Sequence, residues 1–111
     1  MLILNAKIYF YTPEESEGAL SRDIKVGGHI RPAINFGNDI LFSGEIIVKE
    51  KTDFIMRGEY FEVLIEMPTV EEEAYSTVKT FVKEGNDFRI QSASRINGWG
   101  KILGFIFVPT L

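Results

Sequence analysis

The sequence predicts a mainly β fold, a small closed β-barrel of about six antiparallel strands with one inserted α-helix. Short runs rich in isoleucine, valine and phenylalanine recur along the chain, separated by breaks that contain glycine or proline. In one of these runs, residues 60–67, Phe61, Val63, Ile65 and Met67 recur with the period of two that is typical of a half-buried strand. Helical spacing occurs in residues 70–83. Several short strands around one core, with a single helix, indicate a small barrel or sandwich.

The expected strands cover most of the chain. The first spans Leu2 to Tyr11 and ends before Thr12-Pro13, because proline has no N–H to donate to a strand ladder. The acidic segment from Glu14 to Arg22 follows neither the helical nor the strand period, so we expect an exposed loop. The other expected elements are strands at 41–48, 60–67, 88–92 and 101–108, a turn at Arg57-Gly58-Glu59 and a glycine-containing turn at residues 97–100.

The helix is expected over residues 70–83. Thr69-Val70-Glu71-Glu72 has the spacing of a capping box, and Gly85 is placed to end the helix. We expect Glu71, Glu72 and Glu73 to complement the helix dipole and face water, and the apolar stripe to pack on the barrel. The stripe consists of Val70, Ala74, Tyr75, Val78, Phe81 and Val82.

The composition is that of one globular domain, residues 1–111. The chain is 45% hydrophobic and 25% charged, as in ordinary folded proteins. It has no cysteine, which excludes disulfides and thiolate metal sites and favours the cytoplasm. The apolar start lacks the features of a signal peptide, and no apolar run is long enough to span a membrane. A net charge of −4 with scattered basic residues disfavours autonomous nucleic-acid binding.

The residue inventory indicates a protein that is not an enzyme and has no cofactor. His29 is the single histidine, and it lies between two glycines and Arg31-Pro32, where a loop role is expected instead of a catalytic base. Glu71, Glu72 and Glu73 do not make a zinc site, which needs three or four converging ligands. The segment Gly98-Trp99-Gly100-Lys101 is no phosphate loop, because Arg95 replaces the first glycine and Ile102 follows the lysine. Turn and close-packing roles are expected for these glycines.

A series of short motifs runs in order along nearly the whole chain. The first three are Ala6-Lys7-Ile8-Tyr9 with an acidic loop ending at Glu17-Gly18, then Gly28, Arg31-Pro32 and Phe36, and then Ser43-Gly44-Glu45-Ile46. The last two are Met56-Arg57-Gly58-Glu59 and the spaced set Phe88, Ile90, Arg95, Gly98 and Gly100. Together they resemble motifs of the third, C-terminal β-barrel domain of bacterial elongation factor Tu. In the same order, the motifs of that domain are its opening strand and loop, the G-x-R-P-x-x-x-F element, the T-G-T-I strand, the M-P-G-D turn and the F-x-I-x(4)-R-x(2)-G-x-G ending. The resemblance implies a stand-alone barrel of that kind, with residues 70–83 as an insertion.

The departures from the family limit what the resemblance implies about function. The chain has no GTPase domain and no second barrel, so GTP hydrolysis is not implied. In the factor this barrel helps to hold the tRNA acceptor and T stem, contacts the exchange factor and packs on the GTPase domain. The arginine and glutamate of the family's R-E-G-G-R loop are Gln91 and Ser92 here, which leaves Arg95, and its H-T-P segment is Ser21-Arg22-Asp23. These changes weaken an inherited tRNA role.

The leading hypothesis is a non-enzymatic, translation-factor-like module that binds a protein, such as a regulator, a decoy or an immunity-type protein linked to the translation machinery. An alternative is a tRNA- or RNA-binding barrel that places Arg31, Arg89, Arg95 and Lys101 on phosphates. A third is a structural or oligomeric module with Trp99 and the run 102–108 in an interface, although an inner strand also explains that run. The candidate partner-binding residues are Arg31, Arg95, Trp99, Lys101, Glu71, Glu72 and Glu73.

Overall fold

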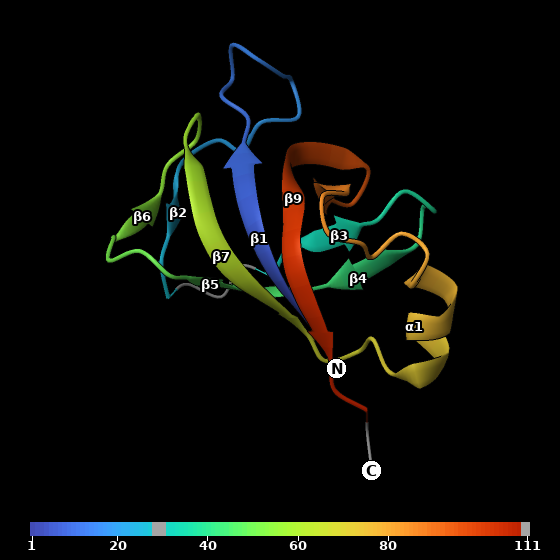
Figure 1. Cartoon of the computed structure of the whole chain (residues 1–111). Coiled ribbons are helices and arrows are strands. Elements are labelled where there is room, and N and C mark those ends of the chain that lie inside the picture. The colour runs from blue at the N-terminus through green and yellow to red at the C-terminus, as the bar shows by residue number, and fades with distance from the viewer. Residues whose placement is uncertain (28–30, 110–111) are drawn as a thin grey trace.

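The computed structural model describes residues 1–27 and 31–109, and over these residues the chain forms nine strands and one helix (Figure 1). The expected roles of Gly28 and His29 fall outside the described residues. In chain order the elements are β1 (Leu2–Phe10), β2 (Ile24–Lys25), β3 (Ala33–Asn35), β4 (Leu41–Ser43), β5 (Glu45–Val48), β6 (Phe54–Ile55), β7 (Tyr60–Met67), α1 (Glu72–Val78), β8 (Asp87–Ser92) and β9 (Arg95–Phe107). The mainly β class is therefore confirmed.

Seven strands form one curled antiparallel sheet in the order β4-β3-β8-β9-β1-β7-β5, while β2 and β6 pair separately. Strands β4 and β5 are the two edges and do not pair with each other, so the expected closed barrel is wrong and the sheet is a half-barrel (Figure 1). The chain crosses from one edge to the other through Gly44 alone. A Cβ at Gly44 would lie 2.6 Å from the Ile65 side chain, which shows how closely this crossing packs on the core.

Alternation along the strands places the core inside the curl. In β1 and β7 every second side chain is buried, as the period of two predicts. Gly58 takes a φ of 81° in the predicted turn before β7, and its N–H donates to the Phe10 carbonyl at 2.8 Å. The central buried side chains include Leu2, Leu4, Ile8, Phe10, Ile34, Phe61, Val63, Ile65, Met67, Phe88, Ile90 and Ile102.

Helix α1 is shorter than expected, and the predicted capping box is wrong. The Val70 N–H donates to the Met67 carbonyl at 3.2 Å, a turn that keeps Thr69 outside the helix. Glu71 takes the N-cap position without a side-chain cap bond. After α1 the chain continues in turns to Gly85, whose φ is 89°.

The apolar stripe of this segment packs on the sheet, as predicted. Val70, Val78 and Val82 are at most 1% exposed and belong to the core. The Tyr75 ring stacks on Phe107 of β9, with centroids 4.2 Å apart and planes 9° from parallel. No helix within the described ranges is long and apolar enough to cross a membrane.

Strand β9 corrects a second expectation, because the predicted turn at residues 97–100 lies inside it. The hairpin between β8 and β9 turns at Ala93-Ser94 instead, with Ala93 at a φ of 52°. Gly98 and Gly100 permit close approach: a Cβ at Gly100 would overlap the Phe88 ring, and one at Gly98 would lie 2.9 Å from the Phe10 Cα. Of the two roles expected for these glycines, close packing is confirmed and the turn is wrong.

Candidate functional site

A row of six side chains crosses the sheet, one from each of six strands. Register alone builds it, because each residue lies directly opposite the next on the neighbouring strand. Ile34, Phe88, Ile8 and Phe61, which adjoin members of the row along their strands, are buried in the core. The row therefore faces outward, since successive strand side chains point to opposite faces. We call this set the cross-strand row: Leu41, Asn35, Arg89, Trp99, Tyr9 and Tyr60.

Aromatic rings occupy one end of the cross-strand row. Tyr60 lies with its ring centroid 4.9 Å from that of Tyr9 and 5.9 Å from that of Trp99, in tilted and edge-to-face contact respectively. Tyr11 adds an edge-to-face contact with Tyr9 at 6.3 Å, and the Lys7 ammonium lies 5.0 Å from the Tyr60 centroid. Tyr60 is 51% exposed despite these contacts. The cluster is a connected apolar surface that solvent still reaches.

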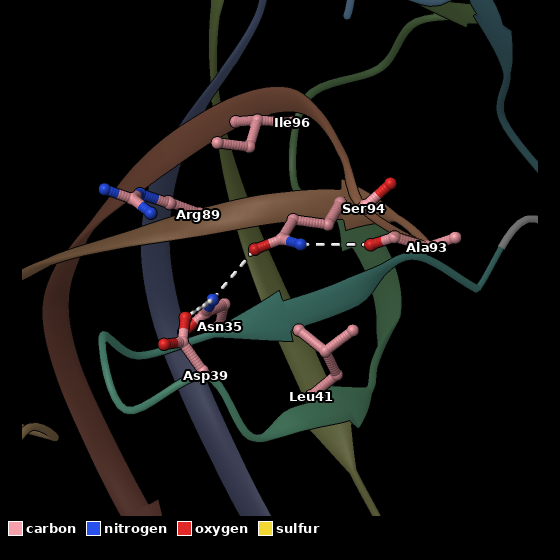
Figure 2. Close-up of a pocket in the computed structure, with 8 residues that line it drawn as sticks. Asn35, Asp39, Leu41, Arg89, Ala93, Ser94 and Ile96 are labelled. Carbon is pink, nitrogen blue, oxygen red and sulfur yellow. Dashed lines mark hydrogen bonds between the residues drawn. The ribbon is translucent and has the colours of Figure 1, made fainter.

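A groove with a polar floor occupies the other end of the row. Two adjoining hollows of about 440 and 540 Å³ share Asn35, Arg89 and Ile96, and the larger hollow reaches Trp99 and Tyr11. Figure 2 shows Asn35 and Arg89 in the smaller hollow, with Leu41 and Ile96 lining it as well. Volumes of this size suit a small molecule or a few side chains of a partner.

Buried amides fix the groove floor. Asn35 is 3% exposed, and its Nδ2 donates to the Gln91 Oε1 at 2.8 Å and, at 3.5 Å, to the Asp39 carboxylate. The Gln91 Nε2 in turn donates to the Ala93 carbonyl at 3.0 Å (Figure 2), and the Gly37 N–H donates to the Asn35 Oδ1 at 2.8 Å. With both amides engaged, the floor is preorganised and has few polar atoms left unsatisfied.

The charges on this face balance. Arg89 is exposed, and its guanidinium makes no hydrogen bond or ion pair with any other described residue. The register row next to the cross-strand row reads Glu62, Lys7, Lys101 and Asp87 over four strands, so each lysine lies opposite one carboxylate. The face has cations available to a partner, but it is not a continuous basic surface of the kind that binds phosphate backbones.

A hydrogen bond orients the central tyrosine. The Tyr9 hydroxyl donates to the Glu15 carboxylate, at 2.9 and 2.8 Å from its two oxygens. This bond raises the pKa of Tyr9 above its ordinary value. The pKa of Glu15 is lowered by the Thr12 backbone N–H, which donates to the carboxylate, and by the Tyr9 hydroxyl. The phenol therefore stays neutral and pointed at the loop, leaving its ring in the aromatic cluster.

The candidate residues proposed from the sequence lie in different parts of the structure. Trp99 lies in the cross-strand row, and Lys101 lies in the next row on the same face. The Arg95 guanidinium donates to the Glu17 and Ala19 carbonyls, both at 3.1 Å, so it holds the loop after β1. Arg31 is exposed next to β3. Glu71, Glu72 and Glu73 are exposed at the start of α1, as predicted, and form no part of the groove.

Sequence reasoning missed most of the row. It selects Trp99 for its residue type and Arg89 only as an RNA contact, and it gives no functional role to Tyr9, Tyr60, Asn35 or Leu41. A signal existed in the outward positions of the alternating strands, where Tyr9 and Tyr60 are aromatic although solvent faces them. Such positions usually carry polar residues in a sheet with one wet face.

The described residues contain no group of three His, Asp or Glu side chains that could hold a metal ion. The pKa of Asp23 is also lowered, chiefly because the Arg57 backbone N–H donates to it. Like Tyr9 and Glu15, it anchors a loop.

No known family model matches this chain, and no curated protein matches it either. The geometry of the outer face must therefore carry the functional argument.

Proposed function

We propose that this chain is a non-enzymatic binding module whose partner is a protein that docks across the outer face of the sheet. The observation that carries the proposal is the cross-strand row, which places two tyrosines, a tryptophan and an arginine in one register line. The side chain of this arginine bonds to no residue in the described part of the chain. Tyrosine, tryptophan and arginine dominate the binding energy of protein interfaces, since each combines a large apolar surface with a polar end.

The charge pattern favours a protein over RNA. Glu62 and Asp87 flank the two lysines beside the row, and Glu15 holds the Tyr9 hydroxyl. A phosphate backbone laid over the aromatic cluster would meet these carboxylates as well as the cations, whereas a protein surface can match both signs. The overall charge of −4 acts in the same direction.

The identity of the partner is proposed from the motif resemblance. If the chain is a relative of the third domain of elongation factor Tu, its partner is a component of the translation machinery or a protein that recognises that factor. A regulator, a decoy and an immunity-type protein all fit this role. Fold similarity does not determine function, so this part rests on the order of the motifs alone.

A site-specific photo-crosslinker tests the docking face. Replacing Tyr60 by p-benzoylphenylalanine places the reactive ring on the face, and the same replacement at Phe54 of β6 is a control of similar exposure, 51% against 46%. In extract of the producing cells, position 60 should give a discrete protein adduct and position 54 should not. Trp99→Ala should reduce recovery of the adduct at least about tenfold, as expected at an interface hot spot.

Two control measurements complete the test. Charge reversal at Glu71, Glu72 and Glu73 should leave the adduct unchanged, because these residues lie outside the row. Equal adducts from positions 60 and 54, or recovery insensitive to Trp99→Ala, would move the binding surface elsewhere. Labelled tRNA titrated at two salt concentrations decides the RNA alternative: tight binding that falls steeply with salt and depends on Arg89 would replace the protein proposal.

A further inference from the structure

Arg89 lines both hollows of the groove, and Figure 2 shows its side chain among those that border the smaller one. Its guanidinium is the basic group among the described lining residues, and it bonds to no other residue in the described part of the chain. The buried amides of Asn35 and Gln91 are already engaged with the protein. A guanidinium presents its N–H donors in a planar fork that fits a carboxylate with two parallel hydrogen bonds. The groove therefore offers a ligand one charged donor group of defined shape.

Two strained turns give the smaller hollow its shape. Asp39 and Ala93 are the non-glycine residues with positive φ in the described part of the chain, at 61° and 52°, and both line this hollow. The Asn35 amide bonds to the Asp39 carboxylate, and the Gln91 amide bonds to the Ala93 carbonyl. Strained backbone persists where the surrounding structure enforces it, and it is concentrated at binding sites. The amide network therefore holds a preformed hollow beside Arg89.

The charges around Arg89 favour a single carboxylate over a chain of phosphates. Asp39 lines the smaller hollow and Asp87 lines the larger one, and Asp87 lies opposite Lys101 on β9. A polyanion that followed the groove would pass both carboxylates, whereas one acidic side chain can reach Arg89 alone. The groove is thus complementary to an isolated negative charge.

Apolar side chains flank Arg89 in both hollows. Leu41 and Ile96 line the smaller hollow, and Tyr11 and Trp99 line the larger one. Trp99 lies directly opposite Arg89 in the register of β8 and β9. A carboxylate on Arg89 would therefore place its neighbouring residues against apolar groups. Such groups exclude water and so strengthen a charged hydrogen bond beside them.

We propose that the groove takes an acidic side chain of the docking protein, with its carboxylate on Arg89 and an adjacent apolar side chain against Trp99 and Tyr11. The proposal rests on the proposed function, because it specifies the chemistry of the partner that docks across the cross-strand row. Charge complementarity at Arg89 and the apolar lining beside it select this occupant.

Capped tripeptides test this chemistry without the partner. One contains glutamate, phenylalanine and leucine, and its control has glutamine in place of glutamate. The indole N–H of Trp99, the single tryptophan of the chain, reports binding in proton–nitrogen NMR of the labelled protein. The glutamate peptide should shift this resonance and bind at least about tenfold more tightly than the glutamine peptide, and Arg89→Gln should remove that preference. Arg31→Gln removes the same charge from an exposed arginine outside both hollows and should leave the preference unchanged.

The crosslinking experiment separates this proposal from the proposed function. Arg89→Gln should reduce the adduct formed from the Tyr60 position at least about tenfold, and Arg31→Gln should not reduce it. An adduct that requires Trp99 but not Arg89 would overturn the carboxylate proposal and leave the docking face unchanged. The proposal is also overturned by a Trp99 resonance that no peptide shifts, by equal dissociation constants for the two peptides, or by an equal loss in Arg31→Gln. Absence of the adduct would instead contradict the proposed function, and the peptide titration would still decide the preference for a carboxylate.

Discussion

The three glycines of β9 allow one substitution to be made at three sites that differ only in the space around them. A methyl group at Gly100 would overlap the Phe88 ring, and one at Gly98 would enter the backbone of β1 near Tyr9 and Phe10. At Gly104 no atom outside the chain neighbours lies within 4 Å. Alanine at each position therefore measures close packing while strand, residue type and added volume stay constant.

The expected magnitudes follow from these contacts. Phe88 is 2% exposed and contacts Phe36, with ring centroids 6.3 Å apart, so its ring cannot move aside without repacking the core. Inserting a methyl into such a core costs about 1–3 kcal/mol. Gly100→Ala should lower the free energy of unfolding by about this amount, and Gly98→Ala by at least as much, because backbone atoms yield less than a side chain. Gly104→Ala should be neutral or stabilise by up to about 1 kcal/mol through the unfolded chain.

Urea unfolding followed by Trp99 fluorescence and by circular dichroism measures all three variants, with thermal melting as a check. For a domain of this size, about 1 kcal/mol corresponds to a shift of roughly 4 °C or more in the melting temperature. Equal stabilities of Gly100→Ala and Gly104→Ala would refute the packing argument. The same result would also remove the reason given for the strand running through residues 97–100.

Two further predictions concern the loops around β1. The bonds of Asp23 to Arg57 lower the pKa of Asp23, so its contribution to stability is present at neutral pH and is lost as the pH falls below about 4. Asp23→Asn should therefore make the acid side of a stability–pH curve shallower. An unchanged curve would exclude this linkage. Arg95→Ala should speed amide hydrogen exchange in residues 12–19, because the Arg95 guanidinium binds two carbonyls there, and should leave the exchange of β7 unchanged. If exchange in residues 12–19 is the same in the variant and the wild type, the Arg95 bonds are not needed to hold this loop.

Local pattern was enough to predict the strands that alternate cleanly. In β7 the four residues Phe61, Val63, Ile65 and Met67 are at most 5% exposed, as the period of two implies. The prediction of a turn failed at Gly98 and Gly100 because glycine has two structural roles. These two glycines allow close packing inside a strand, whereas Gly58 supplies a positive φ in a turn. Composition does not separate these roles, because the difference lies in which distant residue approaches the glycine.

The predictions of the helix start and of a closed sheet were wrong for related reasons. A capping box describes a possible local bond, but the turn from Met67 to Val70 uses the backbone first and delays α1 until Glu72. Closure depends on pairing between β4 and β5, which are separated by one residue and therefore cannot form a hairpin with each other. The cross-strand row could not be predicted from the sequence either, because it can be identified only once the register of six strands is known.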